Sequence, residues 1–151
     1  MKILILYATY SGSTDLASAV IEETLKTGHE VKRLLVSQTD PQLLNEYQLI
    51  VLCSPSWDFD GNEGMPHEDF LTFFEKVSQN MYENKKFAVL GLGDSSYAKF
   101  CGAVDHLEKF VNDKKGVILT PSLKIDGFFY DQTGNTQKIK NWVISWQKEL
   151  H

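Results

Sequence analysis

The sequence predicts an α/β fold, with a doubly wound, five-stranded parallel sheet and helices on both of its faces. Five apolar, strand-like runs alternate with helical patterns along the chain, and strict alternation implies parallel strands joined by right-handed crossovers. The runs are apolar throughout, as in Leu49-Ile50-Val51-Leu52, which is typical of strands that helices cover on both sides. The length of 151 residues fits one domain, so we expect residues 1–151 to fold together.

The predicted elements follow one another in a regular order. Strands are expected at 2–8, 30–36, 48–54, 86–92 and 117–125. Helices are expected at 14–27, near 41–46, and at 67–82, 101–114 and about 135–150. Gly28 lies where a glycine would end the first helix, and the residues from Pro66 to Asp69 supply the proline and acids typical of a first helical turn. Ligands of such sheets bind beyond the carboxyl ends of the strands, so we expect the chemistry in the loops 9–14, 54–66, 93–101 and 126–134.

Composition excludes several classes of function. The net charge of −5 argues against a nucleic-acid partner. No apolar run approaches the length of a membrane span, and the N-terminus has no signal-peptide layout, so we expect a cytoplasmic protein without a membrane partner. Cys53 and Cys101 have no metal-binding spacing, and the four histidines form no cluster, so no metal is expected. The histidines are expected on the surface or in helices, and only His67 falls near the loops of interest.

A loop rich in hydroxyl groups follows the first strand. It reads Thr9-Tyr10-Ser11-Gly12-Ser13-Thr14 and contains no charged residue. Backbone N–H groups, hydroxyl donors and the positive end of the following helix could together bind a phosphate. The loop lacks the Gly-Lys-Ser/Thr ending of a P-loop. The alternative is an ordinary strand-to-helix turn with Ser13 or Thr14 as its N-cap.

Two further loops each carry a large aromatic residue. The first begins Ser54-Pro55-Ser56-Trp57-Asp58, and the second reads from Gly93-Asp94 through Tyr97 to Phe100-Cys101-Gly102. Two aromatic rings beside a phosphate loop could enclose a planar ring system. Taken singly, Trp57 could instead pack on its own helix, and Tyr97 could be a partly buried tyrosine. The coincidence of three such loops favours a planar cofactor that carries a phosphate.

These loops resemble those of the short-chain flavodoxins, a family of FMN-binding electron carriers. Thr9–Thr14 is similar to the family's phosphate loop, while Gly93–Tyr97 and Phe100–Asp105 resemble its second flavin loop. Leu123–Gly127 resembles the fifth strand, without the insertion of the long-chain subgroup. The resemblance covers essentially the whole chain. It implies a flavodoxin-like sheet with the strand order 2-1-3-4-5.

The resemblance implies FMN as the cofactor and assigns the residues that hold it. The phosphate would be bound by Thr9, Tyr10, Ser11, Gly12, Ser13 and Thr14. Trp57 and Tyr97 would flank the isoalloxazine ring, Asp94 and the backbone at Phe100-Cys101 would meet its pyrimidine edge beside Gly93, and Ser54, Pro55 and Ser56 would line the ribityl side. The family has glycine directly after the first aromatic, at a peptide that flips on reduction. Here Asp58 takes that place and glycine comes only at Gly61, so either residue could belong to this peptide. Phe128-Phe129-Tyr130 could be core or edge packing, or an apolar rim around the flavin.

The resemblance implies a low-potential one-electron carrier rather than an enzyme. Its FMN would be tightly but non-covalently bound, would use the semiquinone/hydroquinone couple, and would pass electrons between reductases and acceptor enzymes. No basic side chain is expected near the ring, and aromatic faces and carboxylates disfavour the anion of reduced flavin. The partners implied are redox proteins with basic docking faces, of the flavodoxin/ferredoxin reductase or oxidoreductase type. We expect the protein itself to be a monomer. They would dock on an acidic segment that contains Asp58, Asp60, Glu63, Glu68 and Asp69.

Two alternatives share the cofactor residues. An FMN-dependent NAD(P)H or quinone reductase would need a second pocket over the flavin, for which this compact chain has no spare segment. An FMN-carrying accessory protein of one enzyme would share every cofactor residue. A third alternative, a phospho-receiver domain, does not share the cofactor residues. It would need acidic residues at the ends of the first and third strands, where the chain has Tyr7-Ala8 and Cys53-Ser54, so the sequence excludes it.

Overall fold

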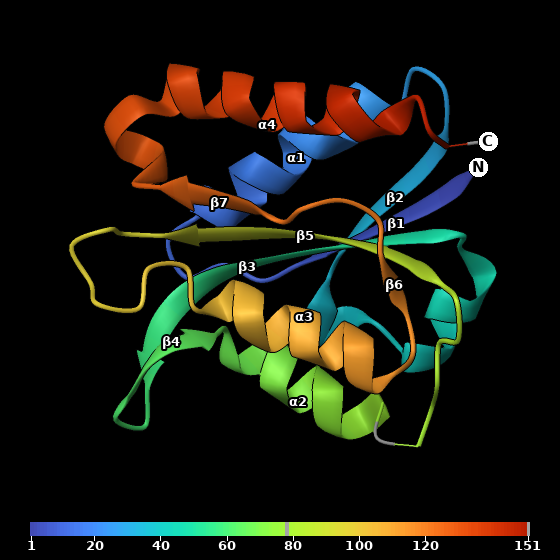
Figure 1. Ribbon diagram of the computed structural model, residues 1–151, viewed down its shortest axis with the longest axis horizontal. Coiled ribbons are helices and arrows are strands. Elements are labelled where there is room, and N and C mark those ends of the chain that lie inside the picture. Colours follow the sequence, from blue (N-terminus) through green and yellow to red (C-terminus); the bar gives the residue numbers. More distant parts are fainter. Residues whose placement is uncertain (78, 151) are drawn as a thin grey trace.

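The structure, a computed structural model, describes residues 1–77 and 79–150 (Figure 1). Its main strands are β1 (Lys2–Tyr7), β2 (Glu30–Leu35), β3 (Leu49–Phe59) and β5 (Lys86–Gly93). They run parallel in the order β2-β1-β3-β5, and β6 (Val117–Ile118) and β7 (Leu123–Asp126) both pair with the outer edge of β5. The strand order predicted from the sequence is therefore confirmed, with β6 and β7 together in the fifth position.

The number of strands differs from the five predicted. The fifth strand is broken at residues 119–122, where Pro121 has no N–H to donate to a neighbouring strand. The predicted loop 54–66 is instead the far end of β3 and an antiparallel partner, β4 (Asn62–Pro66). Asp60 and Gly61 join these two strands with φ of 53° and 81°. Positive φ at both central residues is typical of the two-residue turn that closes a tight hairpin.

In the described residues, four α-helices cover the sheet, two on each face (Figure 1). They are α1 (Ser13–Leu25), α2 (Glu68–Val77), α3 (Ala103–Asp113) and α4 (Gln132–Gln147). Three short 3₁₀ helices lie between them, at Val36–Gln38, Pro41–Glu46 and Phe128–Asp131. The predicted helix at 41–46 is thus of the 3₁₀ type. The one predicted at 67–82 is helical over Glu68–Val77, and residues 79–82 are not helical. Residue 78 of that helix and His151 lie outside the described residues.

Alternate side chains of each central strand pack against opposite helix layers. In β1, Ile3 and Ile5 join the core under α1 and α4, whereas Leu4 and Leu6 join the core over α2 and α3. This two-sided burial explains why the strands are apolar without interruption. Helical crossover connections join the strands in parallel, so the carboxyl ends of β1, β3, β5 and β7 come to one edge of the sheet (Figure 1).

Candidate functional site

A cavity of about 710 Å³ opens at this edge of the sheet. Of the residues predicted for a cofactor site, it is lined by Tyr10, Ser11, Ser13, Pro55, Ser56, Trp57, Asp58, Gly93, Asp94, Tyr97 and Cys101. Its wall also contains residues that were not predicted to contact a cofactor, namely Glu63, Gly64, Leu92, Lys99 and Gly127. Phe128, Phe129 and Tyr130 complete the wall. Phe128 is also buried in the core under α1 and α4, as the core alternative predicts, whereas Phe129 and Tyr130 are exposed, as in an apolar rim.

Six predicted residues lie outside the cavity wall: Thr9, Gly12, Thr14, Ser54, Gly61 and Phe100. Ser54 is buried, and its hydroxyl accepts a hydrogen bond from the His67 N–H (3.0 Å) and donates one to the Pro55 carbonyl (2.8 Å). Phe100 packs against the core over α2 and α3, and Gly61 lies in the hairpin turn. These three residues shape the surroundings of the cavity.

Residues 9–14, the hydroxyl loop, form a tight turn into α1. The Thr9 hydroxyl accepts a hydrogen bond from the Gly12 N–H at 2.8 Å, and Gly12 has the left-handed φ of 93° that glycine tolerates best. Gly12 is the N-cap, so the alternative with Ser13 or Thr14 as cap is wrong, and no side chain in the described part of the chain caps the helix. The first N–H groups of α1 therefore point towards the loop without a side-chain acceptor.

The hydroxyl of Thr14 has an unusual environment. The side chain is fully buried, and its Oγ1 has no hydrogen-bond partner among residues 1–77 and 79–150. A buried hydroxyl without a partner costs about 1–3 kcal/mol. An anion bound at the uncapped helix end would supply an acceptor for it and would be favoured by the helix dipole. The hydroxyl loop therefore fits a phosphate group.

Tyr10 of the hydroxyl loop stacks on the His67 ring, and the Trp57 ring is tilted against it. The Tyr10 ring lies 4.0 Å from the His67 ring and 4.5 Å from the Trp57 ring, between ring centroids. His67 is buried, which contradicts the expectation of a surface or helical residue, and its Nδ1 accepts a hydrogen bond from the Asp69 N–H at 3.0 Å. The position of His67 before a helix was visible in the sequence, but its stacking on Tyr10 depends on the folded chain. The stack connects the hydroxyl loop to the β3–β4 hairpin.

The hairpin also packs closely against the 94–102 loop. Gly64 and Gly102 meet so closely that a Cβ atom on Gly102 would lie 2.7 Å from the Gly64 carbonyl oxygen. On either side of this contact, the Lys99 N–H donates to the Glu63 carboxylate at 3.1 Å and the Ala103 N–H donates to the Ser56 hydroxyl at 3.0 Å. Two segments that carry Trp57 and Tyr97 are thus held together in one cavity wall.

Tyr97 lies in a turn that local hydrogen bonds hold in place. Its N–H donates to the Asp94 carbonyl at 3.1 Å, and the Asp94 carboxylate accepts from the Ser96 N–H at 2.8 Å. Asp126, at the end of β7, accepts from the Ser95 N–H at 2.9 Å, and hydrogen bonds from the hydroxyl and N–H of Ser95 keep the pKa of Asp126 below its usual value. Tyr97 is 62% exposed as a residue, so its ring is available to a ligand in the cavity.

The charges around the cavity are mixed. Lys99 is among the residues that line the wall, although no basic side chain was expected near the ring. Asp58, Glu63 and Asp94 also line it, so the wall contains three acidic residues and one basic residue. Burial raises the pKa of the Cys101 thiol to about 12, so this side chain stays neutral and is not a nucleophile. An anionic ligand atom in the cavity would meet more negative than positive charge.

The described residues contain no group of three or more metal-ligating side chains placed to hold a metal ion. Nor does any helix within residues 1–77 and 79–150 have the length and apolar character needed to cross a membrane.

Comparisons with known proteins agree with this arrangement. The family model described as Flavodoxin matches residues 5–128. Probable flavodoxin 2 of Bacillus subtilis (strain 168) is 37% identical over 127 residues, which cover 83% of this chain and 82% of that protein. The crystal structure of oxidised flavodoxin 2 from Bacillus cereus superposes with a TM-score of 0.87 at 29% identity, covering 99% of this chain and all of that one. A Fusobacterium nucleatum flavodoxin solved bound to flavin mononucleotide shares the fold, with a TM-score of 0.82 at 20% identity and 99% of each chain covered. The chain belongs to the flavodoxin family.

Proposed function

We propose that this protein is a low-potential one-electron carrier that holds one FMN, non-covalently, in the cavity at the carboxyl edge of the sheet. Membership of the flavodoxin family supports an FMN-based electron carrier. The observation that carries the proposal is the orphaned Thr14 hydroxyl at an uncapped helix end, beside a cavity lined by Trp57 and Tyr97. A phosphate site next to exposed aromatic rings matches the two halves of FMN.

Different residues would contact different parts of FMN. Residues 9–14 would bind the phosphate, and Pro55 and Ser56 would lie along the ribityl chain. Trp57 and Tyr97 would flank the ring, while Asp94 and the backbone at Cys101 would face its pyrimidine edge. Ser54 and Phe100 would act indirectly, by fixing the backbone on which these residues lie. FMN supplies reversible one-electron chemistry when bound, and the protein binds it, orients it and limits its contact with water.

The charges in the cavity wall tune the potential. Aromatic faces exclude water, and acidic residues outnumber basic residues at the wall. Both effects disfavour negative charge on a reduced cofactor, which makes that state a stronger reductant. Lys99 opposes this effect, so the potential depends on how the Lys99 ammonium group is placed relative to Asp58 and Glu63.

Absorbance spectra of the purified protein during stepwise reduction test the proposal. A carrier should show FMN absorbance at one equivalent per chain and two separate one-electron steps. The isolated protein should not turn over NAD(P)H repeatedly, which separates a carrier from an FMN-dependent NAD(P)H or quinone reductase. A protein purified or reconstituted without stoichiometric FMN would contradict the proposal.

The Thr14 hydroxyl is expected to discriminate between FMN and riboflavin. Replacing Thr14 with Ala removes a hydrogen bond to a charged group, worth about 1.5–3 kcal/mol, so FMN should bind roughly 10- to 150-fold more weakly. Riboflavin has no phosphate and should be affected little. Thr14→Ser keeps the hydroxyl and serves as the matched control in a fluorescence titration of the apoprotein. Equal losses for both flavins in Thr14→Ala would show that the phosphate is bound elsewhere.

Acidic side chains near the cavity are expected to steer basic redox partners. Asp58, Asp60 and Glu68 are exposed, whereas Glu63 accepts a hydrogen bond from Lys99 and is better left unchanged. Converting the three exposed acids to amides should lower the electron-transfer on-rate with a basic partner reductase and flatten its salt dependence. The on-rate of the unmodified protein should fall as the Debye length shortens from ~10 Å at 0.1 M to ~3 Å at 1 M salt.

A matched triple variant controls for net charge in this stopped-flow experiment. Glu23, Glu30 and Glu149 are exposed acids outside the cavity wall, and their conversion to amides changes the charge equally. If both triple variants slow the reaction to the same extent, the acidic segment is not the docking face.

We propose in addition that the carrier works as a monomer in the cytoplasm.

The hairpin turn is expected to depend on Gly61 rather than Asp58. Asp58 lies in β3 and is not among the described residues with positive φ, whereas Gly61 has a φ of 81° and open space around its Cβ position. Gly61→Ala should therefore cost about 1–2 kcal/mol of unfolding free energy from backbone strain alone. If the flipping peptide lies in this turn, the same change should shift the first one-electron potential by a few tens of millivolts. A tenfold change in the equilibrium constant of a one-electron couple corresponds to ~59 mV. Asp58→Gly should leave the potential nearly unchanged. A redox titration in which only Asp58→Gly alters it would contradict this assignment.

A further inference from the structure

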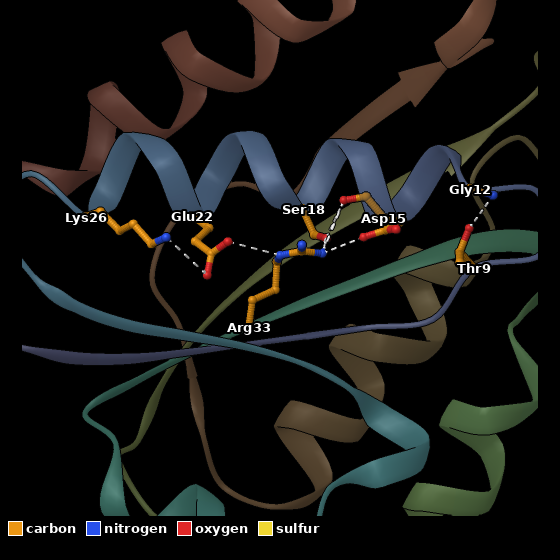
Figure 2. A network of polar contacts seen from close by, with 7 residues as sticks. All are labelled: Thr9, Gly12, Asp15, Ser18, Glu22, Lys26 and Arg33. Carbon is orange, nitrogen blue, oxygen red and sulfur yellow. Dashed lines mark hydrogen bonds and ion pairs between the residues drawn. The ribbon is translucent and has the colours of Figure 1, made fainter.

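Arg33 reaches from the edge strand β2 to the first turns of α1 (Figure 2). Its Nη1 lies 2.6 Å from a carboxylate oxygen of Asp15 and also donates to the Asp15 carbonyl oxygen (3.3 Å) and the Ser18 hydroxyl (3.1 Å). Its Nε donates to the Glu22 carboxylate at 3.3 Å. One guanidinium group thus contacts three successive positions along the same face of α1. A planar fork with several fixed donors suits such a contact better than a lysine would.

These contacts bracket the hydroxyl loop. Asp15 follows the loop directly, and Tyr7, the last residue of β1, lies just before it. The Arg33 guanidinium carbon lies 4.8 Å from the centroid of the Tyr7 ring, a cation–π distance. Arg33 therefore holds both the entry and the exit of the segment that would bind the phosphate. The Arg33 side chain is only 20% exposed, so water screens these contacts less than it would at an open surface.

The charges give Arg33 a second role. Asp15 lies in the first turn of α1, where a carboxylate interacts favourably with the helix dipole. The same helix end would receive a phosphate dianion, and two negative groups at one helix end repel each other. The Arg33 charge compensates that of Asp15, its closest ionic partner.

We infer that Arg33 is a positioning residue for the hydroxyl loop, which fixes the turn into α1 and neutralises Asp15 so that the phosphate of FMN can bind there. The inference rests on the proposed phosphate site. Arg33 itself does not line the cavity, so its effect on the phosphate passes through Asp15 and the helix. A residue that only supported the fold would affect FMN and riboflavin alike, whereas Arg33 acts on the phosphate alone.

Dissociation constants of FMN and riboflavin, measured by fluorescence titration of the apoprotein, test this inference. Arg33→Gln should weaken FMN about tenfold, or 1.4 kcal/mol, and riboflavin less than about twofold. Adding Asp15→Asn to that variant removes the uncompensated carboxylate and should recover at least about threefold in FMN affinity, a coupling that a double-mutant cycle measures. Glu22→Gln is the matched control, because it breaks the other ionic contact of Arg33 about 10 Å further along the helix. It should leave the ratio of the two constants unchanged.

Several results would overturn the inference. Equal losses of affinity for both flavins in Arg33→Gln contradict it, and so does an unchanged affinity for FMN. A selective loss of FMN affinity that the added Asp15→Asn does not recover would contradict it as well. Arg33→Lys keeps the charge but not the fork, and it should lose about threefold in FMN affinity alone. Arg33→Lys tests the inference even if Arg33→Gln does not fold, because an unchanged ratio of the FMN and riboflavin dissociation constants would again overturn it. If the unmodified protein binds FMN and riboflavin equally well, the proposed phosphate site itself fails, and this result is obtained before any variant is made.

Discussion

Replacing Tyr97 with Ala is expected to weaken FMN binding by about 1–3 kcal/mol, or roughly 5- to 150-fold in Kd. Tyr97 lines the cavity and is 62% exposed as a residue, so its ring can cover a planar ligand. The loss combines aromatic stacking with the burial of apolar area. The same change should raise the lower of the two one-electron potentials, because water reaches the ring and stabilises negative charge there.

Tyr97→Phe provides the control for this experiment. It keeps the aromatic face and removes only the hydroxyl, so it should retain nearly all of the affinity and the low potential. Fluorescence titration gives the Kd of each variant, and a redox titration followed by absorbance gives the potentials. If Tyr97→Ala leaves both quantities at the values of the unmodified protein, Tyr97 does not stack on the flavin.

The hydrophobic pattern was sufficient to predict the four main strands of the sheet, but not β4 or the break between β6 and β7. The central strands are buried on both sides, so their sequences are apolar without interruption and stand out from the helical patterns around them. The loops at the carboxyl edge could be predicted for the same reason, because parallel strands all end at one edge. Eleven predicted residues, from Tyr10 to Cys101, line one cavity as a consequence.

The features that were not predicted from the sequence depend mostly on contacts between segments that are distant along the chain. Nothing near Arg33 in the sequence reveals that it binds Asp15 and Glu22 of the preceding helix, and nothing near His67 reveals its stacking on Tyr10. The β3–β4 hairpin is a different case. Asp60-Gly61 is a strong signal for a two-residue turn, and the strand prediction that ended at residue 54 overlooked it. Pro121 likewise signalled the break between β6 and β7.

The contact between Gly64 and Gly102 leads to the second large effect. A methyl group on Gly102 would lie 2.7 Å from the Gly64 carbonyl oxygen and 2.9 Å from its Cα, which are backbone atoms that no rotamer change can move. Gly102→Ala should therefore push the β3–β4 hairpin away from the 94–102 loop and cost about 1–3 kcal/mol of unfolding free energy. The φ of Gly102 is −57°, so the cost comes from the collision and not from backbone strain.

FMN binding should reveal the same displacement. The hydrogen bonds from Lys99 to Glu63 and from Ala103 to Ser56 flank the contact and hold the segments that carry Tyr97 and Trp57. Their loss should loosen both aromatic residues and weaken FMN by about tenfold, or 1.4 kcal/mol, with faster amide hydrogen exchange in residues 57–64. Gly28→Ala is the matched control, because its Cβ would meet nothing within 4 Å and its φ lies outside the left-handed region. It should change none of these quantities. If Gly102→Ala binds FMN as the unmodified protein does and keeps the same exchange rates, the hairpin and the 94–102 loop do not act as one wall, and each aromatic residue is positioned by its own segment.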